Sequence, residues 1–365
     1  MGHLSHVVDR VVNRTALPGA LPASDSAREL VLQTPVVDLL VGSALFRDSF
    51  VRGGGGGHFD LPRMRQAGVR LVGLTVATAW TDLRGSLSRW HFRSLGLPAQ
   101  SVGSHMAIAN WEIGRIERWC AESGGSLVII RTAADLEACL VGDGPSGIVL
   151  GVQGGHVIEG SLANIGRLRE LGVRMFAPGH VMDNVLVGSS TGRRSGGLTA
   201  LGREAIAELE RQGLLVDLAH MSRKGVEQSL PLLSLPFTLS HTGLNEIARG
   251  RSRFRRYSAA TRNIPAALAS EVASAGGLVG IVMSTHLLGG SSLNDAVATI
   301  RLALEACGQE RVGIGSDMDG ALRMVIDVEG YPALADALLT AGVAPSAVEG
   351  VMGRNAVRFL RVAFA

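Results

Sequence analysis

Short apolar runs alternate with amphipathic stretches along most of the chain. Eight runs are rich in Val, Ile and Leu on both faces, as is typical of parallel strands covered by helices. These runs occupy residues 35–41, 69–77, 147–153, 173–180, 214–220, 236–241, 276–284 and 312–319. Several of the amphipathic stretches end in a glycine just before the next run, which is the usual end of a helix. The pattern predicts an α/β fold, a (β/α)8 TIM barrel.

The same pattern predicts one domain. Residues 1–33 are expected to form a helical or irregular lead-in, and residues 34–365 the barrel. The stretch from about residue 80 to 125 separates the second and third strands, so it should add an extra helical insertion after strand 2. A Gly-rich stretch, residues 52–60, is expected to be a flexible loop and not a phosphate loop, because no Gly-Lys-Ser/Thr follows it. A length of 365 residues is within the range of single α/β barrels.

Composition narrows the function classes. The chain is 46% hydrophobic and 18% charged, so it can bury a large core. Its net charge is only +3, and its densest basic stretch, residues 249–262, is more typical of a solvated loop or of a loop near an anionic substrate. We therefore expect no nucleic-acid partner.

The cysteines and the apolar segments indicate in which cellular compartment the protein is expected. The three cysteines lie far apart and outside any CxxC pair, which favours neither a disulfide framework nor a thiolate zinc site. The N-terminus lacks a continuous apolar core of the kind found in signal peptides, and no run is long enough to span a bilayer. The sequence predicts a soluble cytoplasmic protein without a membrane partner.

Polar residues end the predicted strands. His180, His220 and His241 end three consecutive strands, Gln153 ends the third, and Asp317 lies in the eighth. A lone histidine at such a place is more often a core or cap residue, but catalytic residues of these barrels project from the carboxyl ends of the strands. Imidazoles and a carboxylate that meet at this end of the barrel, the barrel mouth, are typical of a divalent metal site, with zinc favoured.

Individual roles follow from the residue types. His220 and His241 would bind metal through neutral nitrogens, and Asp317 would bind metal or act as a general base. Three further histidines lie in predicted loops, where surface roles are expected: His58, His91 and His105.

Several motifs resemble the renal or membrane dipeptidase family, the M19 group of amidohydrolase-like barrels. The matching pieces are "GVQGGHVIEGSLANIGRLRELGVRMF" (151–176), "GLTALGREAIAELERQGLLVDLAHMS" (197–222), "FTLSHTG" (237–243), "TRNIP" (261–265) and "GIGSDMDG" (313–320). The similarity runs in the same order from about residue 35 to the end.

The resemblance implies roles for five residues. In that family two zinc ions share a bridging glutamate at the end of strand three. His220 and His241 match the histidines that complete one metal site, and Asp317 matches the aspartate that serves the other metal and the proton transfers. His180 matches a histidine that assists the substrate and its tetrahedral intermediate. Arg262 matches an arginine that binds the substrate carboxylate, a role that suits a bidentate guanidinium.

The chain departs from the family at three ligand positions. The family's first strand carries a DGHxD motif whose histidine and last aspartate bind metal. Here the segment is "DLLVG", in which Asp38 remains but Leu40 and Gly42 replace the two ligands. The bridging glutamate is replaced by Gln153, which is neutral and a poor bridge between two cations.

The remaining ligands favour at most one zinc ion. They are His220 and His241, with Asp317 or Gln153 as a weak addition, and such a set binds zinc far less tightly than one with carboxylates. An alternative is that His58 and Asp60, in "HFD" after the glycine run, fold back over the mouth and replace the lost pair.

Three functions remain open. The first is a divergent metallohydrolase that cleaves an amide bond in a dipeptide or N-acyl amino acid. Asp317 would transfer the proton, His180 would stabilise the oxyanion, and Arg262, assisted by Gln153, would bind a small-molecule substrate through its carboxylate. The second is a metal-independent enzyme that uses the same pocket for isomerisation, elimination or cyclisation of a carboxylated small molecule. The third is a non-catalytic binding protein. Homologous barrels often dimerise, so a homodimer also stays open.

Overall fold

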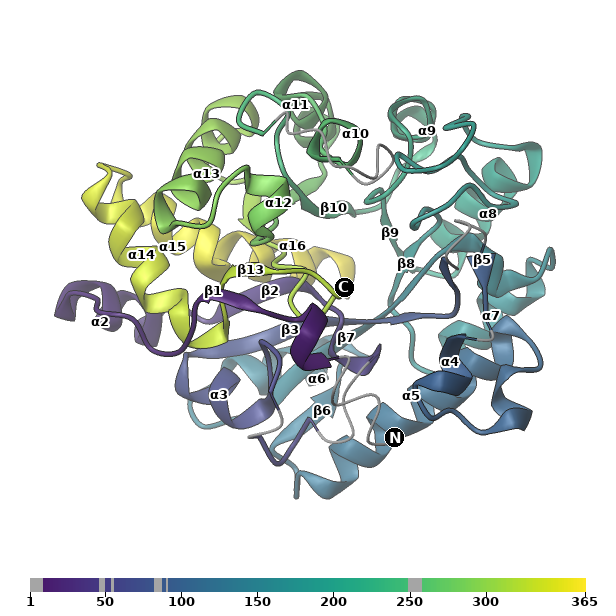
Figure 1. Ribbon diagram of the computed structural model, residues 1–365, viewed down its shortest axis with the longest axis horizontal. Coiled ribbons are helices and arrows are strands. Elements are labelled where there is room, and N and C mark those ends of the chain that lie inside the picture. Colours follow the sequence, from purple (N-terminus) through teal and green to yellow (C-terminus); the bar gives the residue numbers. More distant parts are fainter. Residues whose placement is uncertain (1–8, 46–49, 54–55, 82–86, 90, 249–257) are drawn as a thin grey trace.

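A closed barrel of parallel strands forms the centre of the protein (Figure 1). The structure, a computed structural model, describes residues 9–45, 50–53, 56–81, 87–89, 91–248 and 258–365. The barrel strands, in the order in which they pair, are β2 (Val36–Val41), β3 (Val69–Ala77), β7 (Ser146–Gln153), β8 (Met175–Ala177), β9 (Leu215–Asp217), β10 (Phe237–Thr242), β11 (Leu278–Ile281) and β12 (Val312–Ile314). β12, the last of these strands, pairs with β2, the first, through Ile314 and Asp38, and this pairing closes the barrel. The predicted TIM barrel is confirmed.

Every predicted strand became a barrel strand, but four of them end earlier than their apolar runs. The runs at 214–220 and 312–319 shorten to β9 and β12, because the backbone turns at the barrel mouth. His220 and Asp317 lie beyond these strands with φ of 64° and 60°, in the left-handed region that L-residues rarely adopt. Strained backbone of this kind is common at functional sites.

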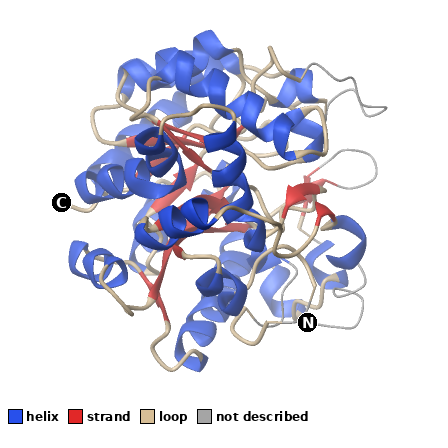
Figure 2. Cartoon of the chain, turned by 90° about the vertical axis from the view of Figure 1, so that its left-hand side faces the viewer, coloured by secondary structure: helices blue, strands red, loops and turns tan. Residues whose placement is uncertain are grey.

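Helices surround the barrel, so the strands lie inside and the helices outside (Figure 2). The main helices are α3 (Leu61–Gln66), α5 (His105–Glu122), α6 (Ala133–Leu140), α7 (Ala163–Glu170), α8 (Ala200–Arg211), α9 (Arg223–Ser229), α11 (Ala266–Ser274), α13 (Leu293–Cys307), α14 (Tyr331–Thr340) and α16 (Asn355–Ala363). α8 shows why they form: the Thr199 side chain accepts the Gly202 N–H at 2.9 Å, and Ile206 and Leu209 are buried against the core.

The predicted insertion between the second and third barrel strands contains helices, as expected. These are the short α4 (His91–Ser94) and the long α5. Three strand pairings in the described residues were not predicted. β4 (Trp80–Thr81) pairs with β5 (Leu87–Ser88), β6 (Leu127–Ile129) pairs in parallel with β7, and β1 (Thr15–Leu17) pairs with β13 (Met324–Ile326). Each strand is too short to show a period of its own.

The remaining short elements close the structure. They are α10 (Ala259–Arg262), α12 (Thr285–Leu288), α15 (Pro345–Glu349) and the π-helical turn Gly350–Arg354. This turn joins α15 to α16. A β-carbon on Gly353 would lie 1.9 Å from the Pro35 carbonyl oxygen, so only glycine lets the turn approach β2 this closely.

The lead-in segment lies against the barrel domain. α2 (Asp25–Gln33) begins at Ser24, whose hydroxyl donates to the Asp336 carboxylate of α14 at 2.5 Å. β1 continues this attachment through its pairing with β13. The division of the chain at residues 33 and 34 stays a prediction.

A buried aspartate joins the first and last barrel strands. Oδ2 of Asp38 accepts hydrogen bonds from the Tyr331 hydroxyl at 2.6 Å and the Ser316 hydroxyl at 2.5 Å, and Oδ1 accepts the Ser316 N–H at 2.9 Å. Burial raises the pKa of Asp38 to about 6, although these hydrogen bonds oppose the shift. The carboxylate that remains in "DLLVG" therefore has a structural role.

Replacing Tyr331 by Phe should lower the free energy of unfolding by about 1–3 kcal/mol, because a buried carboxylate loses a donor. The hydroxyl lowers the pKa of Asp38, so its loss raises that pKa further. Because the folded-state pKa is raised, the contribution of Asp38 to stability is lost as pH rises through about 6. The destabilisation caused by Tyr331→Phe should therefore be larger at pH 8 than at pH 5. Urea denaturation at both values measures it. In an Asp38→Asn background the extra pH dependence should vanish, and its persistence would contradict this assignment.

Candidate active site

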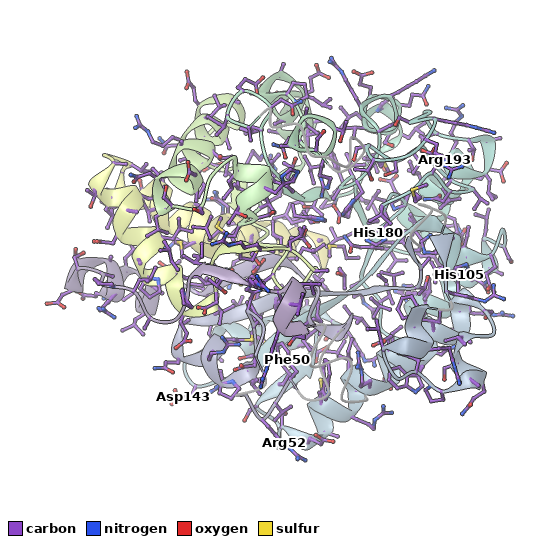
Figure 3. All side chains as sticks on the ribbon, in the orientation of Figure 1. Phe50, Arg52, His105, Asp143, His180 and Arg193 are labelled. Carbon is purple, nitrogen blue, oxygen red and sulfur yellow. The ribbon has the colours of Figure 1, made fainter. Side chains whose placement is uncertain are left out.

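A cavity of about 300 Å³ opens at the carboxyl ends of the barrel strands. Five of the residues predicted from the sequence line it: Gln153, His180, His220, Arg262 and Asp317. They come from β7, from the turns after β8, β9 and β12, and from α10, so segments far apart in the chain meet here. His180 lies near the middle of the molecule in Figure 3. The sixth, His241 of β10, is fully buried beside His220.

His220 and His241 contact each other directly. Their Nε2 atoms are 2.9 Å apart, and Nδ1 of His241 is 2.8 Å from the Ser240 hydroxyl. That hydroxyl donates its proton to Oδ2 of Asp217 at 2.6 Å, so it accepts from His241 Nδ1–H. His241 Nε2 then accepts from His220 Nε2–H, which leaves Nδ1 of His220 buried without a partner among the described residues.

All three histidines of the mouth are neutral at neutral pH. Burial lowers the pKa of His180 to about 4, and the nearby charge of Arg262 lowers it further. Burial and Arg262 also lower the pKa values of His220 and His241 well below the ordinary value. The ring centroids of His180 and His220 are 5.0 Å apart, so the three imidazoles form one continuous row.

Asp317 and Arg262 supply the charges of the cavity. Burial raises the pKa of Asp317 to about 7, although the Arg262 guanidinium opposes the shift. Arg262 is itself buried, and its Nη2 donates to the His241 carbonyl oxygen at 3.0 Å. A carboxyl group that titrates near neutral pH and lines a cavity beside a buried arginine is a candidate for proton transfer.

Gln153, at the end of β7, contacts the neighbouring strand β3 through its amide oxygen. The Thr75 hydroxyl of β3 lies 3.5 Å from Oε1 of Gln153 and 3.5 Å from the Val41 carbonyl oxygen, so the two acceptors share its proton. Nε2 of Gln153 is buried and has no acceptor in the described part of the chain. The side chain thus has an unused donor beside the cavity.

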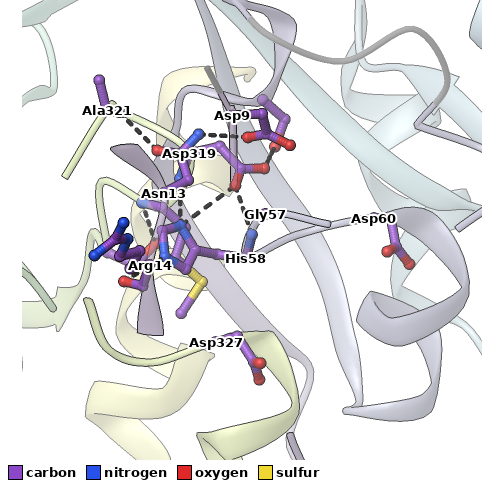
Figure 4. Close-up of polar contacts among 12 residues, drawn as sticks. Asp9, Asn13, Arg14, Gly57, His58, Asp60, Asp319, Ala321 and Asp327 are labelled. Atoms are coloured by element: carbon purple, nitrogen blue, oxygen red, sulfur yellow. Dashed lines mark hydrogen bonds and ion pairs between the residues drawn. The ribbon is translucent and has the colours of Figure 1, made fainter. Parts of the chain in front are cut away.

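The "HFD" segment does not supply a pair of ligands to the cavity. Figure 4 shows His58 beside Asp319, with Asp60 lying apart from both. His58 is fully buried: its Nδ1 accepts the Asp319 N–H at 3.1 Å, and its Nε2 donates to the Arg14 carbonyl oxygen at 3.0 Å. Asp60 caps α3 by accepting the Arg63 N–H at 3.1 Å, and it also pairs with the Arg63 guanidinium. The hypothesis that this segment replaces the lost ligands is wrong, because both polar side chains are already engaged.

The surface roles predicted for the loop histidines were only partly right. His58 is buried, so its prediction was wrong, since the chain returns under the β12 loop after the glycine run. His105 is half-buried, with Nδ1 3.0 Å from the Thr78 carbonyl oxygen and its ring 4.8 Å from that of His156. The side chain of His91 lies outside the described residues, as do residues 54–55 of the glycine run and 249–257 of the basic stretch.

Sequence reasoning missed the support behind the histidines. Asp217 and Ser240 position His241, and an aspartate within the apolar run "LLVDLAH" was the available signal. Asp319 received no role from the sequence, but its buried carboxylate accepts the Ser43 hydroxyl at 2.7 Å and the His58 N–H at 2.6 Å. His286 also lines the cavity.

Comparison with known families agrees with this geometry. A family model described as membrane dipeptidase (peptidase family M19) matches residues 24–364. The chain belongs to this family. An uncharacterized dipeptidase of Schizosaccharomyces pombe is 26% identical over 314 residues, which is 82% of this chain and 71% of that protein. Mouse Dipeptidase 3 is 28% identical over 334 residues, and the match spans 84% of this chain but only 63% of that protein.

Solved structures of two peptidases share the fold. A metallopeptidase of Rhodobacter sphaeroides, liganded with a phosphinate mimic of the dipeptide L-Ala-D-Ala, is 24% identical with a TM-score of 0.73, over 90% of this chain and 99% of that one. Dipeptidase AC, of family M19, is 22% identical with a TM-score of 0.75, over 91% and 99%. Within the described residues of our chain, no helix is long and apolar enough to cross a membrane.

The residues present do not fit the two-zinc centre of the M19 family. Leu40 is packed in the apolar core, and a β-carbon on Gly42 would lie 3.0 Å from the Asp319 carbonyl oxygen and 3.1 Å from Gly320 Cα. A side chain at position 42 would therefore press against the backbone of the β12 loop, which would have to shift by a few tenths of an ångström. Across the described ranges, no group of three or more His, Cys, Asp or Glu side chains is arranged to hold a metal ion.

Proposed function

We propose that this M19 protein is a divergent hydrolase that cleaves the amide bond of a small substrate with a terminal carboxylate. A dipeptide or an N-acyl amino acid is the expected substrate class. The observation that carries the proposal is the pairing of Asp317, whose pKa is about 7, with the buried Arg262 in one cavity. Membership of a dipeptidase family supports the same reaction class.

The chain's own residues can perform each proton step. Arg262 binds the substrate carboxylate and thereby places the amide carbon beside Asp317. The ionised Asp317 accepts a proton from the attacking water, whose oxygen bonds to the carbonyl carbon. His180, a neutral imidazole, donates a hydrogen bond to the carbonyl oxygen as negative charge develops there. Asp317 then returns the proton to the leaving nitrogen as the C–N bond breaks, which yields an acid and an amine.

At most one zinc ion is part of this proposal. His220 and His241 are the residues that would hold it, because their Nε2 atoms face each other at 2.9 Å. Two neutral imidazoles without a carboxylate form a weak zinc site. The proton steps above depend on no metal.

Hydrolysis and metal content together test the proposal. Protein purified without chelator should contain at most one zinc per chain by elemental analysis, and it should release amines from a panel of dipeptides and N-acyl amino acids. His220→Ala should lower any zinc content, and it should abolish turnover because His220 lines the cavity and packs against His180. The melting temperature shows whether the variant is folded. Two zinc ions per chain would contradict the loss of the paired centre. If the panel gives no amine release but carboxylated ligands still bind, metal-independent isomerisation, elimination or cyclisation becomes the better hypothesis.

A further inference from the structure

We propose that His58 and Asn13 are positioning residues, which hold the β12 loop, residues 315–323, in the backbone conformation that places Asp317 in the cavity. The inference rests on the proposed function and deepens it, because it adds two residues that act on the reaction through Asp317. The residues that line the cavity include neither of them. His58 belongs to the "HFD" segment and Asn13 to the lead-in, so both contact the loop from outside the barrel strands.

The backbone alone sets the position of the Asp317 carboxylate. Among the described residues, no group donates a hydrogen bond to this carboxylate, and Arg262 influences it only as a nearby charge. The loop that carries it has an unfavourable backbone, because Asp317, Asp319 and Ala321 have φ of 60°, 59° and 63°, in the left-handed region. Such a conformation persists only where the surrounding structure holds it.

Each of the three left-handed residues has its N–H bound by a group outside the loop. The Asp317 N–H donates to a carbonyl oxygen of β2 at 3.0 Å. The Asp319 N–H donates to Nδ1 of His58 at 3.1 Å, and the Ala321 N–H donates to Oδ1 of Asn13 at 2.9 Å (Figure 4). Two side chains therefore fix two of the three points that determine the course of the loop.

His58 is itself held on both sides. Its backbone N–H donates to Oδ1 of Asp319 at 2.6 Å, so these two fully buried residues bind each other in both directions. Its Nε2 donates to the Arg14 carbonyl oxygen at 3.0 Å, and the same oxygen accepts the Met324 N–H at 2.8 Å. A neutral imidazole with its proton on Nε2 satisfies both ring contacts, so the ring determines where the Asp319 N–H lies.

Asn13 joins the loop to the lead-in segment. Its Nδ2 donates to Oδ1 of Asp9 at 2.6 Å, which orients the amide so that Oδ1 accepts from Ala321. The Asn13 side chain is 5% exposed. Directly after it, β1 pairs with β13 at Thr15 and Met324, where the loop ends. The lead-in segment thus fixes the loop at a side chain and at its last residue.

Two isosteric changes at His58 separate the contact with the loop from the contact with the lead-in. In His58→Asn, Oδ1 takes the place of the ring Nδ1 and can accept the Asp319 N–H. In His58→Gln, Nε2 takes the place of the ring Nε2 and can donate to the Arg14 carbonyl oxygen, but the acceptor for Asp319 is lost. Both variants lose the ring, so each is the packing control for the other.

Turnover measures the effect on Asp317. His58→Gln should lower kcat for the best substrate about tenfold or more, because the proton acceptor is displaced. KM should change little, since Arg262 of α10 binds the substrate carboxylate. His58→Asn should recover most of the lost kcat. Asn13→Ala removes the acceptor for the Ala321 N–H and should lower kcat in the same way, so it carries the test if His58→Gln does not fold. Melting temperatures show which variants are folded.

Hydrogen exchange provides a readout that needs no turnover. Mass spectrometry of peptides that contain residues 315–323 measures how fast the loop amides exchange. His58→Gln and Asn13→Ala should accelerate this exchange about tenfold, because each removes one hydrogen bond of the loop. His58→Asn should exchange at nearly the rate of the wild type.

The possible results are distinct. Wild-type kcat in folded His58→Gln and Asn13→Ala would overturn the proposal, whether or not loop exchange is faster. Equal losses in His58→Asn and His58→Gln, or a rise in KM in place of a fall in kcat, would also overturn it, since either pattern indicates packing alone. If the wild type hydrolyses no amide but the exchange pattern is as expected, the hold on the loop is supported and only the proposed reaction is contradicted.

Discussion

Replacing Asp317 by Asn is expected to lower kcat by about 10²–10⁴-fold, the usual contribution of a positioned general base. Asparagine has nearly the same size but cannot accept the proton of the attacking water. It also tolerates the left-handed backbone at this position, where φ is 60°. The loss should therefore reflect chemistry and not misfolding. Steady-state turnover of the best substrate from the panel measures it.

The pH profile gives Asp317 a second signature. The proton acceptor must be ionised, so kcat/KM of the wild type should rise with pH and reach half of its maximum near 7. The pKa is raised in the folded chain from an ordinary 3.8, so this group stabilises the fold most below pH 4, and that contribution is lost as pH rises through 7. Asp317→Asn should therefore melt at a higher temperature than the wild type at pH 8, and the difference should shrink towards pH 5.

An exposed aspartate provides the matched control for this variant. Asp143 lies in a surface loop, far from His180 in Figure 3, and Asp143→Asn should leave both turnover and the pH profile unchanged. If Asp317→Asn keeps wild-type turnover, or if the wild-type profile is flat between pH 5 and 8, Asp317 is not the proton acceptor.

Replacing Arg262 by Lys is expected to raise KM for carboxylated substrates about tenfold or more, with a smaller change in kcat. Lysine keeps the positive charge but loses the planar fork that binds a carboxylate through two hydrogen bonds. It also loses the donor that Arg262 directs at the His241 carbonyl oxygen. The effect thus separates directed hydrogen bonding from charge alone.

Paired substrates make this second test specific. The wild type should prefer a substrate with a free carboxylate over the same compound with a terminal amide, and Arg262→Lys should lose most of that preference. Arg361→Lys, an exposed change on α16, is the control and should behave as the wild type. An unchanged KM and an unchanged preference in Arg262→Lys would remove Arg262 from the substrate site.

The strand pattern could be predicted because barrel strands are buried on both faces, so each of them is a continuous apolar run. The β1–β13 pair and β6 could not, because three residues such as Thr15–Leu17 carry no period, and their pairing depends on segments far away in the chain. The prediction of a surface role for His58 was wrong for a related reason. Its partners, Arg14 and Asp319, are distant in the sequence and meet it only in the folded chain.

The sequence by itself determined which chemistry the mouth has lost. Leu40, Gly42 and Gln153 have no carboxylate or imidazole in any fold, so the loss of the paired metal ligands follows from residue identity alone. Tertiary structure decided what the remaining groups can do. The raised pKa of Asp317 comes from its burial, and the hydrogen bond between His220 and His241 forms because β9 and β10 lie side by side. Proton affinity and hydrogen-bond direction depend on neighbours in space, and only the closed barrel brings those neighbours together.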